Sequence, residues 1–353
     1  MDTSANIIVH GRSGRNIKLL FIILSFLLVL LFMLDLFLGS VSIRPSDVIR
    51  SLFIDNGSDI RTIVIKFRLP KAVTSVFVGI ALSLSGLQMQ TLFRNPLAGP
   101  YVLGVSSGAS LGVAIVILGF SSGLLSSDFQ GFGNWILVVS AWIGAGAVMM
   151  LIMFISSRVR DIMTILILGI MLASGLSAVV SIMQYFSSES TLKAYVIWTM
   201  GSLGNLSSGQ LKVLMISVSA GVLISIITIK RLNTFLLGEN YAGSMGMNVK
   251  ASRTIIFACT SILAGSVTAF CGPIGFIGIA VPHIVRNIFR SSDHAILVPG
   301  SILAGGIVMT VSDIVSQLPG SESILPINSV TSLIGIPVVI WIILRNRNNS
   351  ASF

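Results

Sequence analysis

Side chains of the types that carry out catalysis are few in this 353-residue sequence, and their spacing does not favour a catalytic centre. The histidines, His10, His283 and His294, are scattered and lack the spacing of metal ligands. Cys259 and Cys271 share one apolar run, and on a helix rising ~1.5 Å per residue they would lie roughly 18 Å apart, too far for a disulfide. We therefore predict no catalytic residue, no metal site and no cofactor, and we interpret His283 as a packing or hydrogen-bonding residue.

One short segment is similar to a motif of ATP hydrolysis. Residues 206–210 read Leu-Ser-Ser-Gly-Gln, as in the signature loop of ABC ATPases. The phosphate-binding sequence Gly-x-x-x-x-Gly-Lys-Ser/Thr, which ATP hydrolysis would also need, does not occur in the chain. We interpret the segment as a turn ahead of a helix. The chain is therefore expected not to hydrolyse ATP alone and not to be an enzyme.

Two carboxylates, Asp35 and Asp313, fall within or at the edge of long apolar segments. A carboxylate inside a membrane segment is a functional candidate by default, and proton relay is one such function. Asp313 comes near the end of its segment, where water or a helix end could also satisfy it. An ion- or proton-coupled secondary transporter, in which Asp313 would be essential, therefore stays open as an alternative class of function.

The elements that must position these residues are membrane-spanning helices. Hydrophobic residues make up 54% of the chain and charged residues 10%, against about 25% charged in soluble domains. The apolar residues form long runs, as helices in lipid require. These runs cover 19–39, 72–92, 101–120, 134–156, 162–184, 211–229, 254–271, 275–289, 295–316 and 327–344. We predict an all-α polytopic membrane protein, with a single transmembrane domain over 1–353 and about ten spans surrounded by lipid.

The distribution of charge predicts the orientation. Lys and Arg give the chain a net charge of +10, but no basic stripe with interleaved aromatic residues accompanies it, so nucleic acid is not an expected partner. Cytoplasmic loops of membrane proteins collect Lys and Arg, and their pattern here places both termini in the cytoplasm. We expect a cytoplasmic N-terminal segment over 1–18, a retained first span rather than a signal peptide, and a long cytoplasmic loop over 230–253.

The first outside loop departs from this charge rule. It is basic although it faces outward, which favours a docking site for an acidic partner. Its basic residues are Arg44, Arg50, Arg61, Lys66, Arg68 and Lys71.

The loop over 230–253 has the pattern of a short amphipathic helix. Leu237, Tyr241 and Met245 recur at every fourth position, and Gly238 and Gly246 bracket them, which suits helix breaks. Such a helix could lie on lipid or could dock in a groove of a partner protein.

A weak internal repeat divides the spans into two sets. Residues 72–184 and 254–344 each hold four spans and begin near a joint rich in Gly and Pro, at 95–100 and 272–275. Two sets of four spans joined by a two-span connection predict pseudo-symmetric halves, a common plan among transporters.

Several longer motifs follow one another in a fixed order. They are Arg68-Leu69-Pro70-Lys71, Arg94-Asn95-Pro96-Leu97-Ala98-Gly99-Pro100, Leu237-Gly238 with Met245-Gly246, Gly272-Pro273-Ile274-Gly275 and Pro282-His283. In these motifs, over about 19 to 345, the chain resembles the permeases of type II ABC importers for iron chelates, haem and cobalamin, the FecCD-type family. We assign structural roles in the motifs to Asn95, Pro96, Pro100, Gly272, Pro273, Pro282 and His283.

The resemblance implies an assembly. Such permeases form dimers with ten spans each, bound to two ATPase subunits inside and one periplasmic or surface binding protein outside, and we expect a homodimer in the bacterial inner (plasma) membrane. The expected cargo is an iron chelate, siderophore or haem, with cobalamin as the alternative. The fifth and tenth spans would line the translocation path at the dimer axis. Ile162 and Met163 match a cytoplasmic gate of that path. Arg68 and Lys71 match positions that dock the binding protein. Coupling to the ATPase is assigned to Leu237, Gly238, Glu239, Tyr241, Ala242, Met245 and Gly246.

Two positions depart from the family pattern. Gln317 stands where some members carry a second docking arginine after the ninth span. Ile324 stands where a glutamate often precedes the Leu-Pro pair, although Glu322 is nearby. These departures put the second docking contact in doubt, but not the resemblance.

Overall fold

The computed structural model describes residues 14–39, 43–54, 59–119, 133–159, 161–317 and 324–350, and these residues form helices without strands. Seven of the helices in these ranges are long and apolar enough to cross a membrane. They are α1 (Gly14–Phe37), the continuous helix of α3 (Asp59–Ile63), η1 (Val64–Arg68) and α4 (Leu69–Leu92), then α6 (Gly133–Arg158), α7 (Ile162–Tyr185), α9 (Ser208–Ile227), α12 (Val249–Cys271) and α14 (His294–Ser316). Shorter apolar helices are α5 (Val105–Ala114) continued by η3 (Ile115–Gly119), and α13 (Ile277–Phe289). In α15 (Ile327–Ser350) the short apolar part is Ile327–Trp341.

These helices confirm the all-α polytopic fold, because each predicted apolar segment contains one of them. Hydropathy did not reveal the short helices between the spans. They are α2 (Pro45–Phe53), η2 (Pro100–Leu103), α8 (Glu189–Thr199), α10 (Ile229–Leu236) and α11 (Glu239–Ser244). The loop over 230–253 therefore holds two helices where the sequence predicted one. Short helices with a polar face do not raise the hydropathy of a long window, so composition alone misses them.

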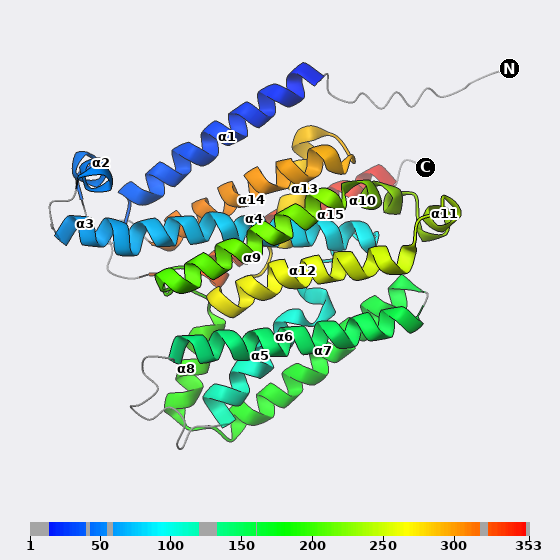
Figure 1. Cartoon of the computed structure of the whole chain (residues 1–353), viewed down its shortest axis with the longest axis horizontal. Coiled ribbons are helices and arrows are strands. Elements are labelled where there is room, and N and C mark those ends of the chain that lie inside the picture. Colours follow the sequence, from blue (N-terminus) through cyan, green and yellow to red (C-terminus); the bar gives the residue numbers. More distant parts are fainter. Residues whose placement is uncertain are drawn as a thin grey trace.

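Helix α4 lies at the centre of the molecule, among α9, α12, α13 and α14 (Figure 1). Its buried positions are mostly small or aliphatic, and its glycines lie against the backbones of neighbouring helices. A Cβ built at Gly79 would overlap the carbonyl oxygen of Gly305 on α14, and one built at Gly86 would overlap that of Gly278 on α13. Close approach of this kind is how helices associate in lipid, where no hydrophobic effect drives them together.

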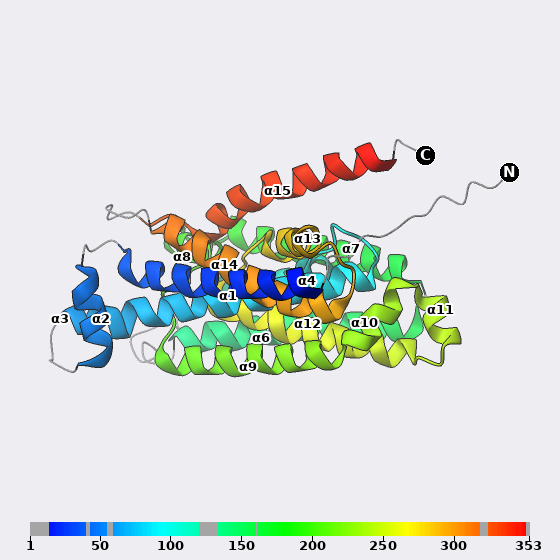
Figure 2. The ribbon, with the colours of Figure 1, turned by 90° about the horizontal axis from the view of Figure 1, so that it is seen from above.

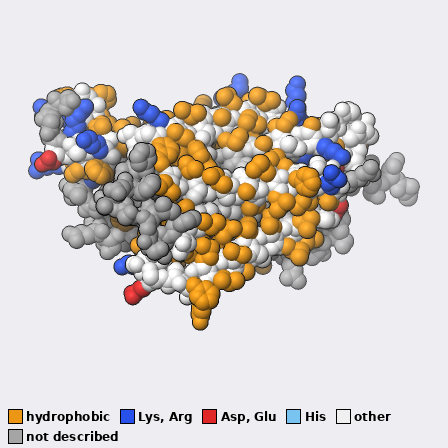
Figure 3. All heavy atoms as spheres, turned by 60° about the horizontal axis from the view of Figure 1, so that its bottom comes forward, with side chains coloured by type: hydrophobic (Ala, Val, Ile, Leu, Met, Phe, Trp, Pro, Cys, Tyr) orange, Lys and Arg blue, Asp and Glu red, His pale blue; other side chains and the backbone are white. Residues whose placement is uncertain are grey.

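The outer helices present apolar side chains over most of their surface. On α1 only 6% of the most hydrophobic window is buried, against 78% for the window on α4. Hydrophobic side chains cover the middle of the face in Figure 3, whereas Lys and Arg gather mostly toward its ends and edges. A broad apolar belt between charged margins is what a lipid bilayer requires.

The two ends of the molecule differ. Helices α10 and α11 lie at one end of the molecule, and α2 and α3 lie at the opposite end (Figure 1). We call the end with α10 and α11 the α11 end, and the end with α2 and α3 the α2 end.

In the view of Figure 2, α15 stands off from the other helices along much of its length. Of the N-terminal segment 1–18, residues 1–13, including His10, lie outside the described residues, as does Glu322.

The segment similar to an ABC signature loop is a helix start, as predicted. Ser207 is the N-cap of α9, and its hydroxyl accepts a hydrogen bond from the amide of Gln210. The Gln210 side chain in turn accepts a bond from the Ser207 amide, at 2.9 Å, which completes a capping box. The cysteines are also as predicted: Cys259 and Cys271 are buried and unbridged.

Candidate functional site

Helix α11 has the shape that the sequence predicts. Gly238 and Gly246 adopt φ angles of +99° and +83°, a region that disfavours residues with a Cβ, and they bound the helix. The side chains of Leu237, Tyr241 and Met245 are 58%, 55% and 61% exposed. An apolar stripe therefore lies on the surface at the α11 end of the molecule.

The other side of α11 is fixed to the body of the protein. Ala242 is fully buried, and the Glu239 carboxylate accepts two hydrogen bonds from the guanidinium of Arg253 on α12, one of them from Nε at 2.6 Å. Arg253 also donates to the carbonyl oxygen of Val159, just after α6. A bidentate arginine–carboxylate pair fixes orientation as well as distance. Glu239 thus ties α11 to α12 and α6, and the Leu237, Tyr241 and Met245 side chains remain on the surface.

The candidate gate lies beside α11. Ile162 and Asp161, at the start of α7, line an open groove of about 780 Å³ together with Arg94. From the α11 region the groove is lined by Leu237, Gly238, Glu239, Asn240, Tyr241 and Ser244. Met163, the second gate candidate, follows on α7 and is 43% exposed. The structure therefore brings a residue of the predicted gate and the predicted coupling helix to one groove.

Asp161 is a residue of this groove that the sequence analysis missed. It caps α7, because its carboxylate accepts hydrogen bonds from the amides of Met163 (3.2 Å) and Thr164 (2.9 Å). Bonds from the Thr164 hydroxyl and these amides hold the pKa of Asp161 below its usual range. Its stabilising effect on the helix start is present above the ordinary aspartate pKa and is lost as the pH falls through the lowered value. An aspartate directly before an apolar run is a helix-start signal that could have identified it.

Arg68, a predicted docking residue, is largely buried. Its guanidinium Nη1 donates to the carbonyl oxygens of Leu36 and Phe37, each at 2.9 Å, at the C-terminal end of α1. A cation at this position stabilises the partial negative charge of a helix end. Arg68 therefore joins α1 to the helix that contains α4, and its role in docking stays a prediction.

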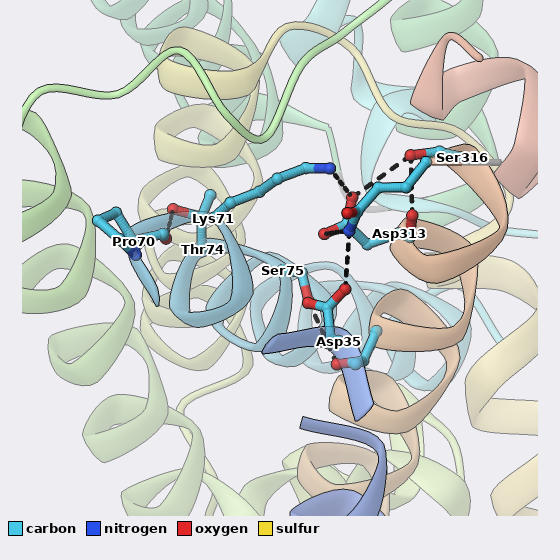
Figure 4. A network of polar contacts seen from close by, with 9 residues as sticks. Asp35, Pro70, Lys71, Thr74, Ser75, Asp313 and Ser316 are labelled. Carbon is cyan, nitrogen blue, oxygen red and sulfur yellow. Dashed lines mark hydrogen bonds and ion pairs between the residues drawn. The ribbon is translucent and has the colours of Figure 1, made fainter. Parts of the chain in front are cut away.

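Lys71, the second predicted docking residue, reaches across to α14. Its Nζ lies 2.9 Å from Oδ1 of Asp313, and the Asp313 side chain is 1% exposed (Figure 4). The lysine side chain is itself 19% exposed, so it is accessible from outside. The sequence analysis proposed water or a helix end as the partner of Asp313, and in the structure a lysine fills that role.

Gln317 joins this pair to a second carboxylate. Its Nε2 donates to Oδ1 of Asp35 on α1, at 2.9 Å, and more weakly to Oδ2 of Asp313, at 3.4 Å. The position that departs from the family's docking arginine is therefore engaged inside the protein. We call Asp35, Lys71, Asp313, Ser316 and Gln317 the acid–lysine cluster. A cavity of about 400 Å³ borders it, and both Arg68 and Lys71 line that cavity.

The motif residues of the joint at 95–100 lie beside α13, inside the protein. His283 Nε2 lies 2.8 Å from the carbonyl oxygen of Pro96 and can donate a hydrogen bond to it. Asn95 closes its own turn by accepting a bond from the amide of Leu97, at 2.9 Å. Pro100 lies against Gly278, near the start of α13. The joint at 95–100 thus packs against the second set of spans.

The second joint, at 272–275, has a backbone conformation and a close contact that require glycine at position 272. Gly272 has φ +76°, and a Cβ there would lie 2.6 Å from the carbonyl oxygen of Trp198. Pro273 follows it in the irregular stretch between α12 and α13, and Pro282 lies inside α13.

With this geometry in view, the comparisons identify the class of protein. The chain belongs to the FecCD transport family, whose model matches residues 27–345. It is 33% identical over 330 residues to the hemin transport system permease protein HmuU of Yersinia pestis, covering 92% of this chain and 96% of that one. It is 35% identical over 342 residues to the vitamin B12 import system permease protein BtuC of Escherichia coli O9:H4 (strain HS), covering 96% and 99%.

A solved structure agrees with the family. A metal-chelate type ABC transporter in an inward-facing conformation matches with a TM-score of 0.81 at 26% identity, over 93% of this chain and 99% of that one. The chain is therefore a multi-pass membrane permease of the ABC import class, in which ATPase subunits, a binding protein and a second permease complete the assembly.

Proposed function

We propose that this chain is the permease subunit of an ATP-driven, binding-protein-dependent importer that carries an iron chelate, siderophore or haem, across the bacterial inner membrane. The observation that supports this best is the exposed apolar stripe of α11, which is fixed from behind by Glu239 and Arg253. The similarity to HmuU favours a haem-like cargo, and the similarity to BtuC keeps cobalamin as the alternative.

The partners follow from the two ends of the molecule. Two ATPase subunits, one on each permease of a homodimer, would bind the α11 ends in the cytoplasm, where both termini also lie. One binding protein would dock on the α2 ends, through acidic groups that reach the cavity bordered by Arg68 and Lys71. The chain itself carries out no covalent chemistry and needs no cofactor.

The contacts between α11 and the rest of the permease suggest how ATP binding to the partner ATPase could open or close the translocation path. A force on α11 passes through the Glu239–Arg253 pair to α12 and to the end of α6. The same movement changes the groove that contains Ile162 at the start of α7. ATP and cargo would then bias one equilibrium between inward- and outward-open states. The apolar Ile162 and Met163 suit a constriction that closes by excluding water.

Reconstitution tests this proposal. The permease is co-expressed with the neighbouring ATPase and binding-protein genes, purified in detergent and placed in liposomes, and ATP hydrolysis is measured with binding protein loaded with haem, a ferric siderophore or cobalamin. We expect the ATPase to co-purify and one cargo to stimulate hydrolysis above the others. Uptake driven by an ion gradient, with no ATPase bound, would contradict the proposal and favour a secondary transporter.

Removing the charge of Lys71 should weaken docking of the binding protein roughly tenfold, as expected for loss of about 1.4 kcal/mol from one partly buried ion pair. Because Lys71→Gln alone would leave Asp313 buried without its partner, the test uses Lys71→Gln together with Asp313→Asn. The dissociation constant is measured by surface plasmon resonance on permease in nanodiscs.

Two controls make this docking test specific. Asp313→Asn alone releases Lys71 from Asp313 and keeps its charge, and should leave docking intact or strengthen it. Lys66→Gln removes the same charge from an exposed side chain nearby and should have little effect. Equal affinities for the double variant and Asp313→Asn would show that Lys71 takes no part in docking.

A further inference from the structure

Two buried carboxylates from distant parts of the sequence meet in the acid–lysine cluster. Asp35 is near the end of α1 and Asp313 near the end of α14, and they are 3% and 1% exposed. Gln317 donates to both of them. Figure 4 labels the two carboxylates together with Lys71 and Ser316. One amide nitrogen, Nε2 of Gln317, bridges the two carboxylates, at 2.9 Å from Oδ1 of Asp35 and 3.4 Å from Oδ2 of Asp313.

The donors available to the two carboxylates are unequal. Asp313 receives the Lys71 ammonium, the Ser316 hydroxyl and a weak bond from Gln317. Asp35 receives a single hydrogen bond, at Oδ1, and its Oδ2 is buried without a hydrogen-bond partner among the described residues. An ionised carboxylate oxygen that is buried and receives no donor is strongly unfavourable.

The charges around Asp35 also favour a neutral carboxyl group. The charged side chains that face it within the described residues are Asp313 from α14, Lys71 from α4 and Arg68 from η1. Lys71 contacts Asp313, and Arg68 donates to the carbonyl oxygens at the end of α1. Two negative charges would therefore lie side by side in a buried site, beside Lys71 and Arg68. Carboxylates that share a site do not both ionise readily.

We propose that Asp35 and Asp313 bind one proton between them, carried at Asp35 Oδ2, so that Asp35, Asp313 and Lys71 form an electrically neutral set beside the cavity. The proton converts the unpartnered oxygen of Asp35 into a donor. The acceptor assigned to it is the carboxylate of Asp313, which shares Gln317 with Asp35. A site of this kind binds a proton from the α2 end of the molecule, since the neighbouring cavity gives access to Lys71.

The occupancy of the site depends on Lys71. When a partner's carboxylate draws Lys71 away, the remaining negative charge on Asp313 has no ion-pair partner in the cluster, and the site takes up a second proton. This consequence for docking rests on the function proposed above, whereas the proton site in the isolated permease does not.

Infrared difference spectroscopy of the full-length permease in nanodiscs tests the proposal without any partner. A protonated carboxyl group has a C=O stretching band that a carboxylate lacks. We expect this band at neutral pH in the wild type, and we expect Asp35→Asn and Asp313→Asn each to remove it, because one carboxylate beside Lys71 ionises. Lys71→Gln should increase the band, because both carboxylates then hold protons.

Two further variants guard against misfolding and against bands from elsewhere. Asp35→Glu keeps a carboxyl group in the cluster and should keep the band at a shifted position. Asp59→Asn removes an exposed aspartate and should leave the spectrum unchanged. Absence of the band from the wild type, or a band that survives both Asp35→Asn and Asp313→Asn, would overturn the proton site and leave the docking role of Lys71 to its own test.

Discussion

Replacing Leu237, Tyr241 and Met245 together by serine should abolish stable binding of the ATPase subunits and leave the permease folded. These side chains are more than half exposed, so the folded permease loses little packing when they are shortened. In the complex they would be buried in a groove of the partner. At ~1.5 kcal/mol each, their loss removes roughly 4.5 kcal/mol of binding free energy, more than about a thousandfold in Kd.

Co-purification and ATP hydrolysis measure this effect. The triple variant should elute without the ATPase from a tag on the permease, at normal permease yield and with normal thermal unfolding in detergent. A matched control removes a similar apolar surface at the opposite end, with Ile49→Ser, Phe53→Ser and Ile54→Ser on or beside α2, whose side chains are 49%, 84% and 48% exposed. This control should retain the ATPase. Retention by both variants would show that α11 is not the coupling helix.

The parts of the fold that the sequence predicts well depend on local patterns. The spans could be predicted because charged side chains are excluded from lipid, which leaves long uncharged runs at each crossing. Helix α11 could be predicted because Gly238 and Gly246 mark its limits and the apolar residues between them repeat with a helical period. The uncharged runs that mark the spans and the glycines that mark α11 are both local features of the sequence, next to the helices that they predict.

The acid–lysine cluster could not be predicted in the same way. The sequence marks Asp35 and Asp313 as carboxylates in apolar segments and Lys71 as a docking candidate, but nothing in it pairs them. Only the packing of α1, α4 and α14 brings the three together. Arg68 shows the same difficulty. Its place in a basic outside loop suggests an exposed residue, but the end of α1 offers two carbonyl oxygens, and the guanidinium turns inward to them. Pairings between distant helices need the three-dimensional arrangement.

Which glycines are essential also depends on the packing of distant helices. Substitution of one such glycine gives the largest effect on stability that we expect. Gly86→Val should prevent α4 and α13 from packing, because its Cβ would overlap the backbone carbonyl oxygen of Gly278. No rotamer relieves a clash that begins at Cβ, so the helices must separate. Separation also breaks the nearby bond from Gln90 Nε2 to the carbonyl oxygen of Ile279, which is 3.1 Å long. We expect a loss of more than about 3 kcal/mol, enough to unfold a marginally stable protein.

Gly146→Val is the matched control for this prediction, because it makes the same change within helix α6 at a position where a new Cβ meets nothing within 4 Å. Fluorescence-detected size-exclusion chromatography should show a monodisperse peak for Gly146→Val and an aggregated or absent peak for Gly86→Val. If the two variants had equal yield and thermal stability, the helices could not be in backbone contact. The contact between α4 and α13 matters for function as well as folding. His283 on α13 is hydrogen-bonded to the carbonyl oxygen of Pro96, in the joint that follows α4. A shift of α13 would therefore move this joint.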